Sequence, residues 1–149
     1  MFTDKERAYL GTQRLAHLAT VSPSGQPDAD VVGFELDGDD VLIGSFQNLA
    51  GSRKYKNVAA GGGMVSLIID SLASVDPMDP VAVKIHGTAS IEQRNGRFGP
   101  MEYIVVRPLT SWSWGVEGPA FVDGEFRPHK QTWPGEDFGF SLTQEGAAL

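Results

Sequence analysis

One stretch carries most of the information on fold and function: Gly44-Ser45-Phe46-Gln47-Asn48-Leu49-Ala50-Gly51-Ser52-Arg53-Lys54-Tyr55-Lys56-Asn57. It follows an expected strand and opens an expected helix over 52–60. Gly51 permits close approach of the backbone, and Ser52 is a good N-cap whose hydroxyl would lie beside free helix N–H groups. Arg53 adds a forked donor and Lys54 a point charge. Together these residue types predict a site for an anion such as a phosphate.

The distribution of charge supports this prediction. The chain has 149 residues, with 12 Lys and Arg against 19 Asp and Glu, for a formal net charge of −7. No acid lies between Asp40 and Asp70, whereas that interval holds Arg53, Lys54 and Lys56. A basic island on an acidic body would attract an anionic ligand. The alternative is that these three side chains form only the solvated face of a short helix, and spacing alone does not decide between the two.

The flanking sequence alternates in the manner of short antiparallel strands. Thr3 and Glu6 have the spacing of a capping box for a short helix that ends near Leu10. Gly- and Pro-containing turns are expected at 22–25, 37–40 and 96–100, with a longer loop at 71–80. Strands are expected at 14–21, 30–36, 41–46, 64–69 and 81–92, with one or two more within 101–114. These elements predict a mainly β fold, a six-stranded antiparallel barrel with short helices.

We expect one barrel domain over residues 1–114 and a loosely structured extension over 115–149. The extension is rich in Gly and Pro and carries six acids against two bases, with one hairpin expected at Asp123-Gly124.

The composition excludes several classes of function. An acidic domain argues against nucleic-acid binding. The absence of cysteine excludes disulfides and thiolate chemistry, and three scattered histidines have no metal-ligand spacing. Without an apolar run of roughly 18 residues or a signal-peptide core, we expect a cytoplasmic protein that does not bind membranes.

The order of strand, Asn48-Leu49-x-Gly51-Ser52-Arg53-Lys54, helix and buried strand resembles the FMN-binding split barrel of the pyridoxamine 5′-phosphate oxidase superfamily. The resemblance runs from about residue 4 to residue 114. It implies that Ser52, Arg53 and Lys54 hold the cofactor phosphate. It also implies a homodimer with cofactor sites at the subunit interface. Further contacts with the cofactor are implied for Ser45 and Phe46, near its ring or ribityl chain, and for Val31 and Val32 in the second strand.

Two departures separate the chain from the true oxidase of that superfamily. The oxidase binds its substrate through an Arg-x-His motif, which this chain matches only in part, at Arg127-Pro128-His129. In addition, Ala82 stands where the oxidase has a glutamine that contacts the flavin. We therefore do not expect synthesis of pyridoxal phosphate. The short form of the chain, including the run Thr110-Ser111-Trp112-Ser113-Trp114-Gly115, is more similar to the branch of reductases that use the deazaflavin coenzyme F420. In that branch Lys56 would meet the acidic tail of the cofactor. Trp112 and Trp114 project to the same side of an extended strand, so they either line a cofactor or substrate pocket by stacking or are buried at a dimer interface.

The resemblance implies an oxidoreductase that transfers hydride from reduced F420 to an unsaturated small molecule. One alternative is an FMN-dependent oxidoreductase of the same fold. A second is a non-catalytic protein that binds a flavin or another small anion, and a purely structural dimer is a third. His86 is expected to be either a proton donor or cofactor contact, or simply an outward or interface histidine. The sequence leaves the proton source and the acceptor open.

Overall fold

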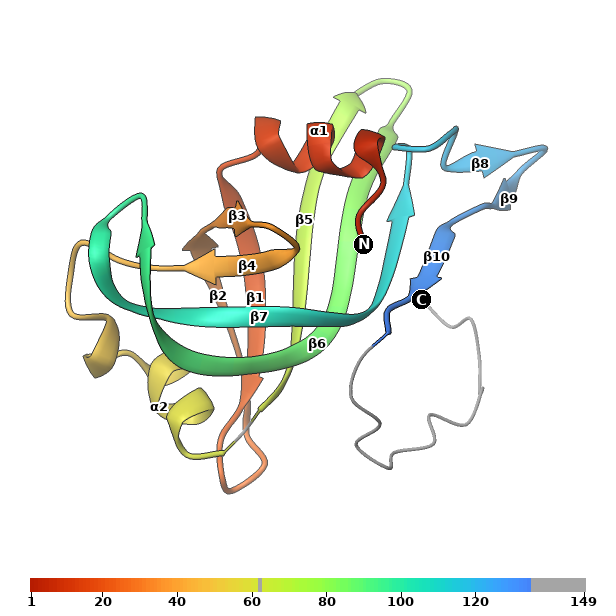
Figure 1. Ribbon diagram of the computed structural model, residues 1–149. Coiled ribbons are helices and arrows are strands. Elements are labelled where there is room, and N and C mark those ends of the chain that lie inside the picture. The colour runs from red at the N-terminus through yellow and green to blue at the C-terminus, as the bar shows by residue number, and fades with distance from the viewer. Residues whose placement is uncertain (62, 135–149) are drawn as a thin grey trace.

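The computed structural model describes residues 1–61 and 63–134 (Figure 1). Its helices are α1 (Asp4–Thr12), the short 3-10 turn η1 (Leu49–Gly51) and α2 (Arg53–Ala59). The strands are β1 (Leu15–Val21), β2 (Pro27–Gly33), β3 (Glu35–Asp37), β4 (Asp40–Ile43), β5 (Met64–Ser74), β6 (Asp79–Gly96), β7 (Gly99–Trp114), β8 (Phe121–Val122), β9 (Glu125–Phe126) and β10 (His129–Thr132). The expected mainly β, antiparallel fold with short helices is confirmed.

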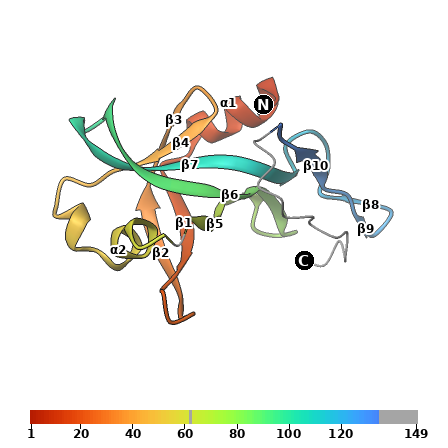
Figure 2. The same ribbon diagram turned by 60° about the horizontal axis from the view of Figure 1, so that its bottom comes forward.

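The main sheet curves until its two ends meet. Its strand order is β2-β1-β5-β6-β7-β4-β3, with β10 added on β7. β2 and β3 lie at opposite ends of this order, yet only Phe34, 4% exposed, separates them in the chain. The sheet must therefore close into a barrel that is split at this point (Figures 1 and 2). The single strand expected over 30–36 is thus two strands, and with β10 the main sheet has eight strands rather than six.

β6 and β7 form the long bent hairpin on which the barrel is built. They have 18 and 16 residues, and β5 pairs with only the first part of β6, from Asp79 to Thr88. The register between β6 and β7 shifts at His86 and Gly87. A Cβ at position 87 would lie 2.3 Å from the carbonyl oxygen of Arg107, so only glycine allows this approach. The expected loop at 71–80 is wrong, because β5 and β6 continue through most of it.

A buried carboxylate joins the N-terminal helix to the C-terminal part of the sheet. Glu6 in α1 is 0% exposed and accepts hydrogen bonds from Thr3 N (3.0 Å), Ser113 Oγ (2.6 Å) and Gln131 Nε2 (2.8 Å). The capping box expected from Thr3 and Glu6 is confirmed. Three donors compensate the cost of burying this charge, so α1, β7 and β10 are held at one point.

The described part of the expected extension contributes to this packing. Trp133 donates from Nε1 to Ser111 Oγ (3.0 Å), and its ring lies edge-on to Phe2 with centroids 4.7 Å apart. The hairpin expected at Asp123-Gly124 is confirmed as β8 and β9. Residues 135–149 of the extension lie outside the described residues. None of the described helices is long and apolar enough to cross a membrane.

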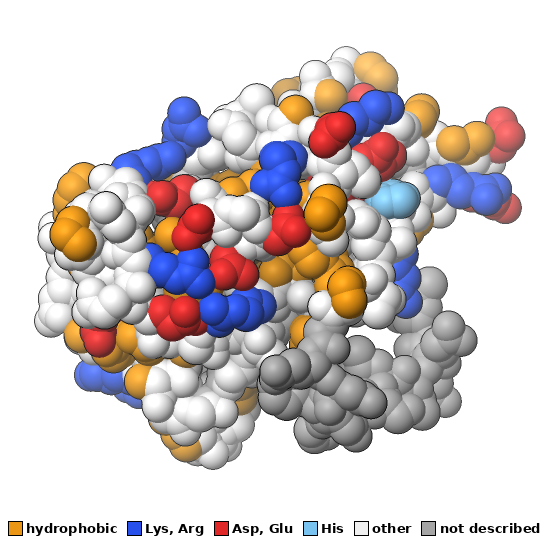
Figure 3. Space-filling model, in the orientation of Figure 1, with side chains coloured by type: hydrophobic (Ala, Val, Ile, Leu, Met, Phe, Trp, Pro, Cys, Tyr) orange, Lys and Arg blue, Asp and Glu red, His pale blue; other side chains and the backbone are white. Residues whose placement is uncertain are grey.

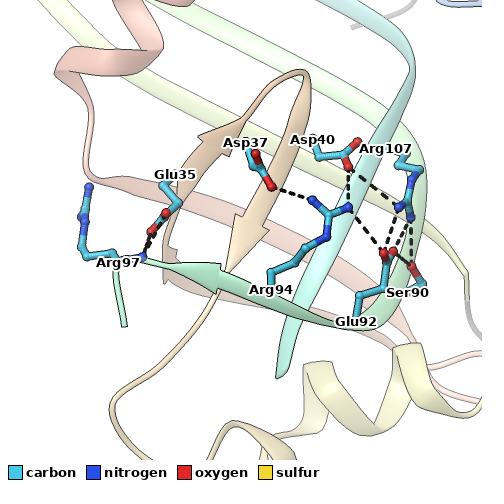
Figure 4. Close-up of polar contacts among 8 residues, drawn as sticks. All are labelled: Glu35, Asp37, Asp40, Ser90, Glu92, Arg94, Arg97 and Arg107. Atoms are coloured by element: carbon cyan, nitrogen blue, oxygen red, sulfur yellow. Dashed lines mark hydrogen bonds and ion pairs between the residues drawn. The ribbon is translucent and has the colours of Figure 1, made fainter. Parts of the chain in front are cut away.

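An ion-pair network connects the β3–β4 hairpin to β6 and β7 (Figure 4). Arg94 lies 2.6 Å from Asp37 and 2.8 Å from Asp40, and Arg107 binds Glu92 through both terminal nitrogens. Figure 3 shows basic and acidic side chains side by side on this face. Hydrogen bonds from Arg107 and Ser90, and the charge of Arg107, lower the pKa of Glu92 to about 2. The pairs fix the short hairpin on the barrel.

We expect Glu6→Gln to lower the free energy of unfolding by about 2 kcal/mol, because the amide presents a donor where the carboxylate accepts buried hydrogen bonds. Chemical denaturation of both proteins measures the difference. Glu125→Gln, at an exposed position, is the matched control and should leave stability unchanged. Equal stability of wild type and Glu6→Gln would contradict the role given to Glu6.

We expect Glu92 to stabilise the fold above its unfolded-state pKa, near 4.5, and to lose this contribution as the pH falls toward about 2. The direction follows from a folded-state pKa that lies below the unfolded one. Glu92→Gln should therefore cost about 1–2 kcal/mol at neutral pH and progressively less in acid. Denaturation series at several pH values compare the two proteins. A difference independent of pH would contradict this assignment.

Candidate functional site

The connection from β4 to α2 has the local geometry expected of a strand-to-helix site. Asn48 Oδ1 accepts from Gly51 N (2.9 Å), and a Cβ on Gly51 would lie 2.4 Å from Asn48 Nδ2. Ser52 is the N-cap of α2, as predicted: its Oγ accepts from Tyr55 N (3.4 Å) and donates to Leu49 O (2.6 Å). A side chain at position 51 would displace Asn48 from this hydrogen bond, so local packing accounts for the glycine without a ligand. Arg53, Lys54 and Lys56 follow on the first turns of the helix.

The three basic side chains have different surroundings. Arg53 is exposed, and in residues 1–61 and 63–134 no carboxylate pairs with it. Lys54 is tied to β2, with Nζ 2.6 Å from Asp30 Oδ2 and a side chain only 16% exposed. Lys56 is exposed. Arg53 thus has its full charge available to a ligand, whereas Asp30 neutralises part of the charge of Lys54.

Arg53 borders a surface cavity of about 340 Å³ that Asn57 also lines. Asn57, on the cavity wall, is 1% exposed and donates from Nδ2 to Thr20 Oγ1 (2.9 Å). Its Oδ1 has no hydrogen-bond partner among the described residues. The β1–β2 turn supplies Ser22, Ser24 and Gln26 to the lining, and β2 adds the carboxylate of Asp28. The Arg53 guanidinium suits an anionic group, and the serine hydroxyls and the Asp28 carboxylate suit a ligand that also carries hydrogen-bond donors.

Ser45 and Phe46 lie on the same connection, immediately after β4. Ser45 Oγ accepts from Gln47 N (3.1 Å). Phe46 is 87% exposed, and its ring meets Phe98 edge-on with centroids 4.2 Å apart. So exposed a phenyl ring offers an apolar surface to a planar ligand or to a second subunit. The structure therefore brings Ser45 and Phe46 into one segment with Ser52, Arg53 and Lys54.

Val32 and Trp114 are placed elsewhere. Val32 is 4% exposed and packs in the core, while its neighbour Val31 is 55% exposed on the outer face. Trp114 packs edge-on against Phe126, with centroids 5.5 Å apart. Figures 1 and 2 show the C-terminal end of β7 beside β8 and β10, away from α2. Within one protomer the side chains of Val32 and Trp114 do not join the Arg53 cavity.

Sequence reasoning did not single out Lys84 and Lys130, which the sheet brings to the two sides of Trp112 on the outer face. β6 places Lys84 opposite Trp112, and β10 places Lys130 opposite the same residue. His86 meets the Trp112 ring edge-on at 4.8 Å. Desolvation, and then the charge of Lys84, lower the pKa of His86. No local pattern could have revealed this group, because its members lie on strands distant in sequence.

No three His, Asp or Glu side chains of the described chain gather as a metal site would require. The curved antiparallel sheet, closed through Phe34, defines the class of small split barrels. The chain belongs to the pyridoxamine 5′-phosphate oxidase family, whose model matches residues 2–109. The resemblance stated from the sequence is therefore confirmed.

Individual relatives extend this assignment. A Streptomyces rimosus protein named 5a,11a-dehydrotetracycline/5a,11a-dehydrooxytetracycline reductase is 36% identical over 122 residues, which cover 78% of this chain and 85% of that protein. A solved structure named F420 Reductase has a TM-score of 0.54 and 21% identity, over 70% of this chain and 94% of its own. General Stress Protein 26 from Bacillus anthracis has a TM-score of 0.59 and 16% identity, over 87% and 98%. At these identities the two structures show the shared fold.

Proposed function

We propose that the protein is a homodimeric oxidoreductase that uses reduced F420 to transfer hydride to an unsaturated small-molecule acceptor. The observation that carries the proposal is the 36% identity to a reductase of dehydrotetracyclines across most of both chains. The fold shared with a structure named F420 Reductase is consistent with it. We do not propose synthesis of pyridoxal phosphate, since Ala82 and the 127–129 segment depart from the true oxidase.

The residues at the β4–α2 connection fit a cofactor with a phosphate and a hydroxylated chain. Arg53 would bind the phosphate, since its guanidinium is exposed and has no carboxylate partner in the described residues. Ser52 would fix the backbone there, and Lys54, held by Asp30, would add a second positive charge. Lys56 would meet the acidic tail that distinguishes F420 from FMN, while Ser45 and Phe46 would lie along the ring or ribityl chain.

When bound, the reduced deazaflavin would supply a hydride to one carbon of the acceptor double bond, and the second carbon would take a proton from solvent. His86 is a poor candidate for the proton donor, because its lowered pKa keeps the imidazole neutral near pH 7. Trp114 would act at an interface rather than within the Arg53 cavity of its own protomer. The contribution of this chain is thus to bind and orient the two reactants.

The outer face of the sheet supports a dimer. Five large apolar side chains on three adjacent strands point outward and are exposed: Leu15, Val21, Val31, Met64 and Leu72. So many exposed apolar side chains on one sheet face are typical of an interaction surface. A second copy related by a twofold axis would bury the same face on both subunits. Val31 would then lie in the interface, close to Asp30 and therefore to Lys54.

We expect Arg53→Ala to weaken F420 binding at least tenfold, because it removes the unpaired cation of the cavity. Fluorescence titration with F420, and separately with FMN, measures the Kd. Arg127→Ala removes an exposed arginine elsewhere and should bind as wild type, and thermal melting should show both variants folded. An unchanged Kd for Arg53→Ala would exclude the phosphate assignment. Preference for FMN would favour the flavin-dependent alternative, and binding without turnover would favour a carrier.

We expect Val31→Asp to produce a monomer, because a carboxylate would have to be buried within the interface. Analytical ultracentrifugation gives the mass of each protein in solution. Val122→Asp, at an exposed apolar position on β8, serves as the matched control and should remain dimeric. A monomeric wild type, or a dimeric Val31→Asp, would contradict the proposed interface.

A further inference from the structure

A second surface cavity, of about 280 Å³, lies between the C-terminal end of α1, the strand β3 and the turn from β6 to β7. This closure cavity is named for Phe34, the single residue between β2 and β3, which lines it. It includes Arg14, directly before β1, whereas the Arg53 cavity includes Ser22, directly after β1. The seven residues of β1 span roughly 20 Å, so the two cavities are separate.

Three arginines and one glutamate give the closure cavity a positive lining. Arg7 is fixed at one side, where its guanidinium binds Asp39 and donates to Gly38 O (2.7 Å). Glu35 accepts from the backbone N–H of Arg97 through both carboxylate oxygens, at 3.0 and 2.8 Å. The two carboxylates are thus already engaged, and the cavity keeps an excess of positive charge.

The side chains of Arg14 and Arg97 have their charge available to a ligand. Both are exposed, and in the part of the chain that the structure describes neither guanidinium pairs with a carboxylate. Arg14 donates only from Nη1, to the backbone carbonyls of Gly11 (3.3 Å) and Gln13 (3.4 Å). Figure 4 shows the Arg97 side chain directed away from the Arg94 network. A guanidinium binds a carboxylate through two parallel hydrogen bonds, so these two side chains suit an organic acid.

The floor of the closure cavity is apolar. Leu10 in α1 and Phe34 are 2% and 4% exposed, and Leu36 in β3 is half-buried. The volume is just below the range of about 300–1,000 Å³ that is typical of sites for drug-sized molecules, so a smaller molecule fits. Exposed cations above apolar side chains favour a ligand with an anionic head and a short apolar body.

We propose that the closure cavity binds a small organic carboxylate, with its charge held by Arg14 and Arg97 and its apolar body over Leu36. This site goes beyond the proposed reductase function and does not depend on it. The ligand would connect α1, β3 and the β6–β7 turn around the point where the barrel closes. A ligand that binds only the folded state stabilises it, so occupancy would raise the melting temperature of the protein.

Octanoate is the probe, and isothermal titration calorimetry with the full-length protein measures its Kd. We expect Arg14→Gln and Arg97→Gln each to weaken binding about fivefold to tenfold, and the double variant to lose it. Octanol lacks the charge and acetate lacks the apolar body, so each should bind at least about tenfold more weakly than octanoate. Arg127→Gln removes an exposed arginine from another part of the surface and is the matched control, with an unchanged Kd.

The site is contradicted if octanoate does not bind, if it binds wild type and the double variant equally, or if octanol binds as tightly. Octanoate should also raise the melting temperature of wild type but not of the double variant, and the same melting curves establish that each variant is folded. In NMR spectra the backbone amides of Gly11 and Arg97 should shift on binding, whereas shifts confined to the outer face of β1, β2 and β5 would exclude this cavity. Arg53→Ala should bind octanoate as wild type does, whether or not F420 binds, and loss of octanoate there would overturn the separation of the two sites.

Discussion

β2 and β3 occupy opposite ends of the sheet and are joined by Phe34 alone, so the sheet has no freedom to remain open. Closure requires the two longest strands to bend, and the bend is possible because Gly87 lets β6 approach the carbonyl of Arg107. The short β3–β4 hairpin is held by pairing of β4 with β7 and by the buried side chains of β4, and Arg94 adds ion pairs to Asp37 and Asp40 on its outer side. The single-residue connection at Phe34 thus places the two ends of the sheet side by side, and these features accompany the closure.

Closure of the barrel also determines the position of the candidate ligand-binding site. The connection that leaves β4 must cross to β5 at the far side of the barrel, and α2 makes that crossing beside β1 and β2. The basic island of the sequence is thereby set against the β1–β2 turn, where Asn57 and Arg53 share a cavity. The outer face is divided into an apolar part on β1, β2 and β5 and a cationic part on β6, β7 and β10.

Local patterns were sufficient for the features that depend on neighbours in the chain. The capping box at Thr3 and Glu6, the N-cap at Ser52 and the hairpin at Asp123 were predicted because each is made within a few residues. Features that depend on distant pairing were missed. Alternation could not show that 30–36 is divided at Phe34, that β10 returns to β7, or that Lys84 and Lys130 meet at Trp112. Likewise Val32 could be assigned to a strand, but its inward direction depends on the register with β1.

The buried carboxylate of Glu6 has a consequence for how the chain is made. Its partners Ser113 and Gln131 are more than 100 residues further along, so α1 leaves the ribosome long before the donors that its carboxylate needs. Since an ionised carboxylate is not buried without them, the nascent chain cannot dock α1 in its final position until nearly all of the described barrel has been synthesised. The first helix of the chain is therefore expected to be among the last elements to dock, and to be available to chaperones throughout translation.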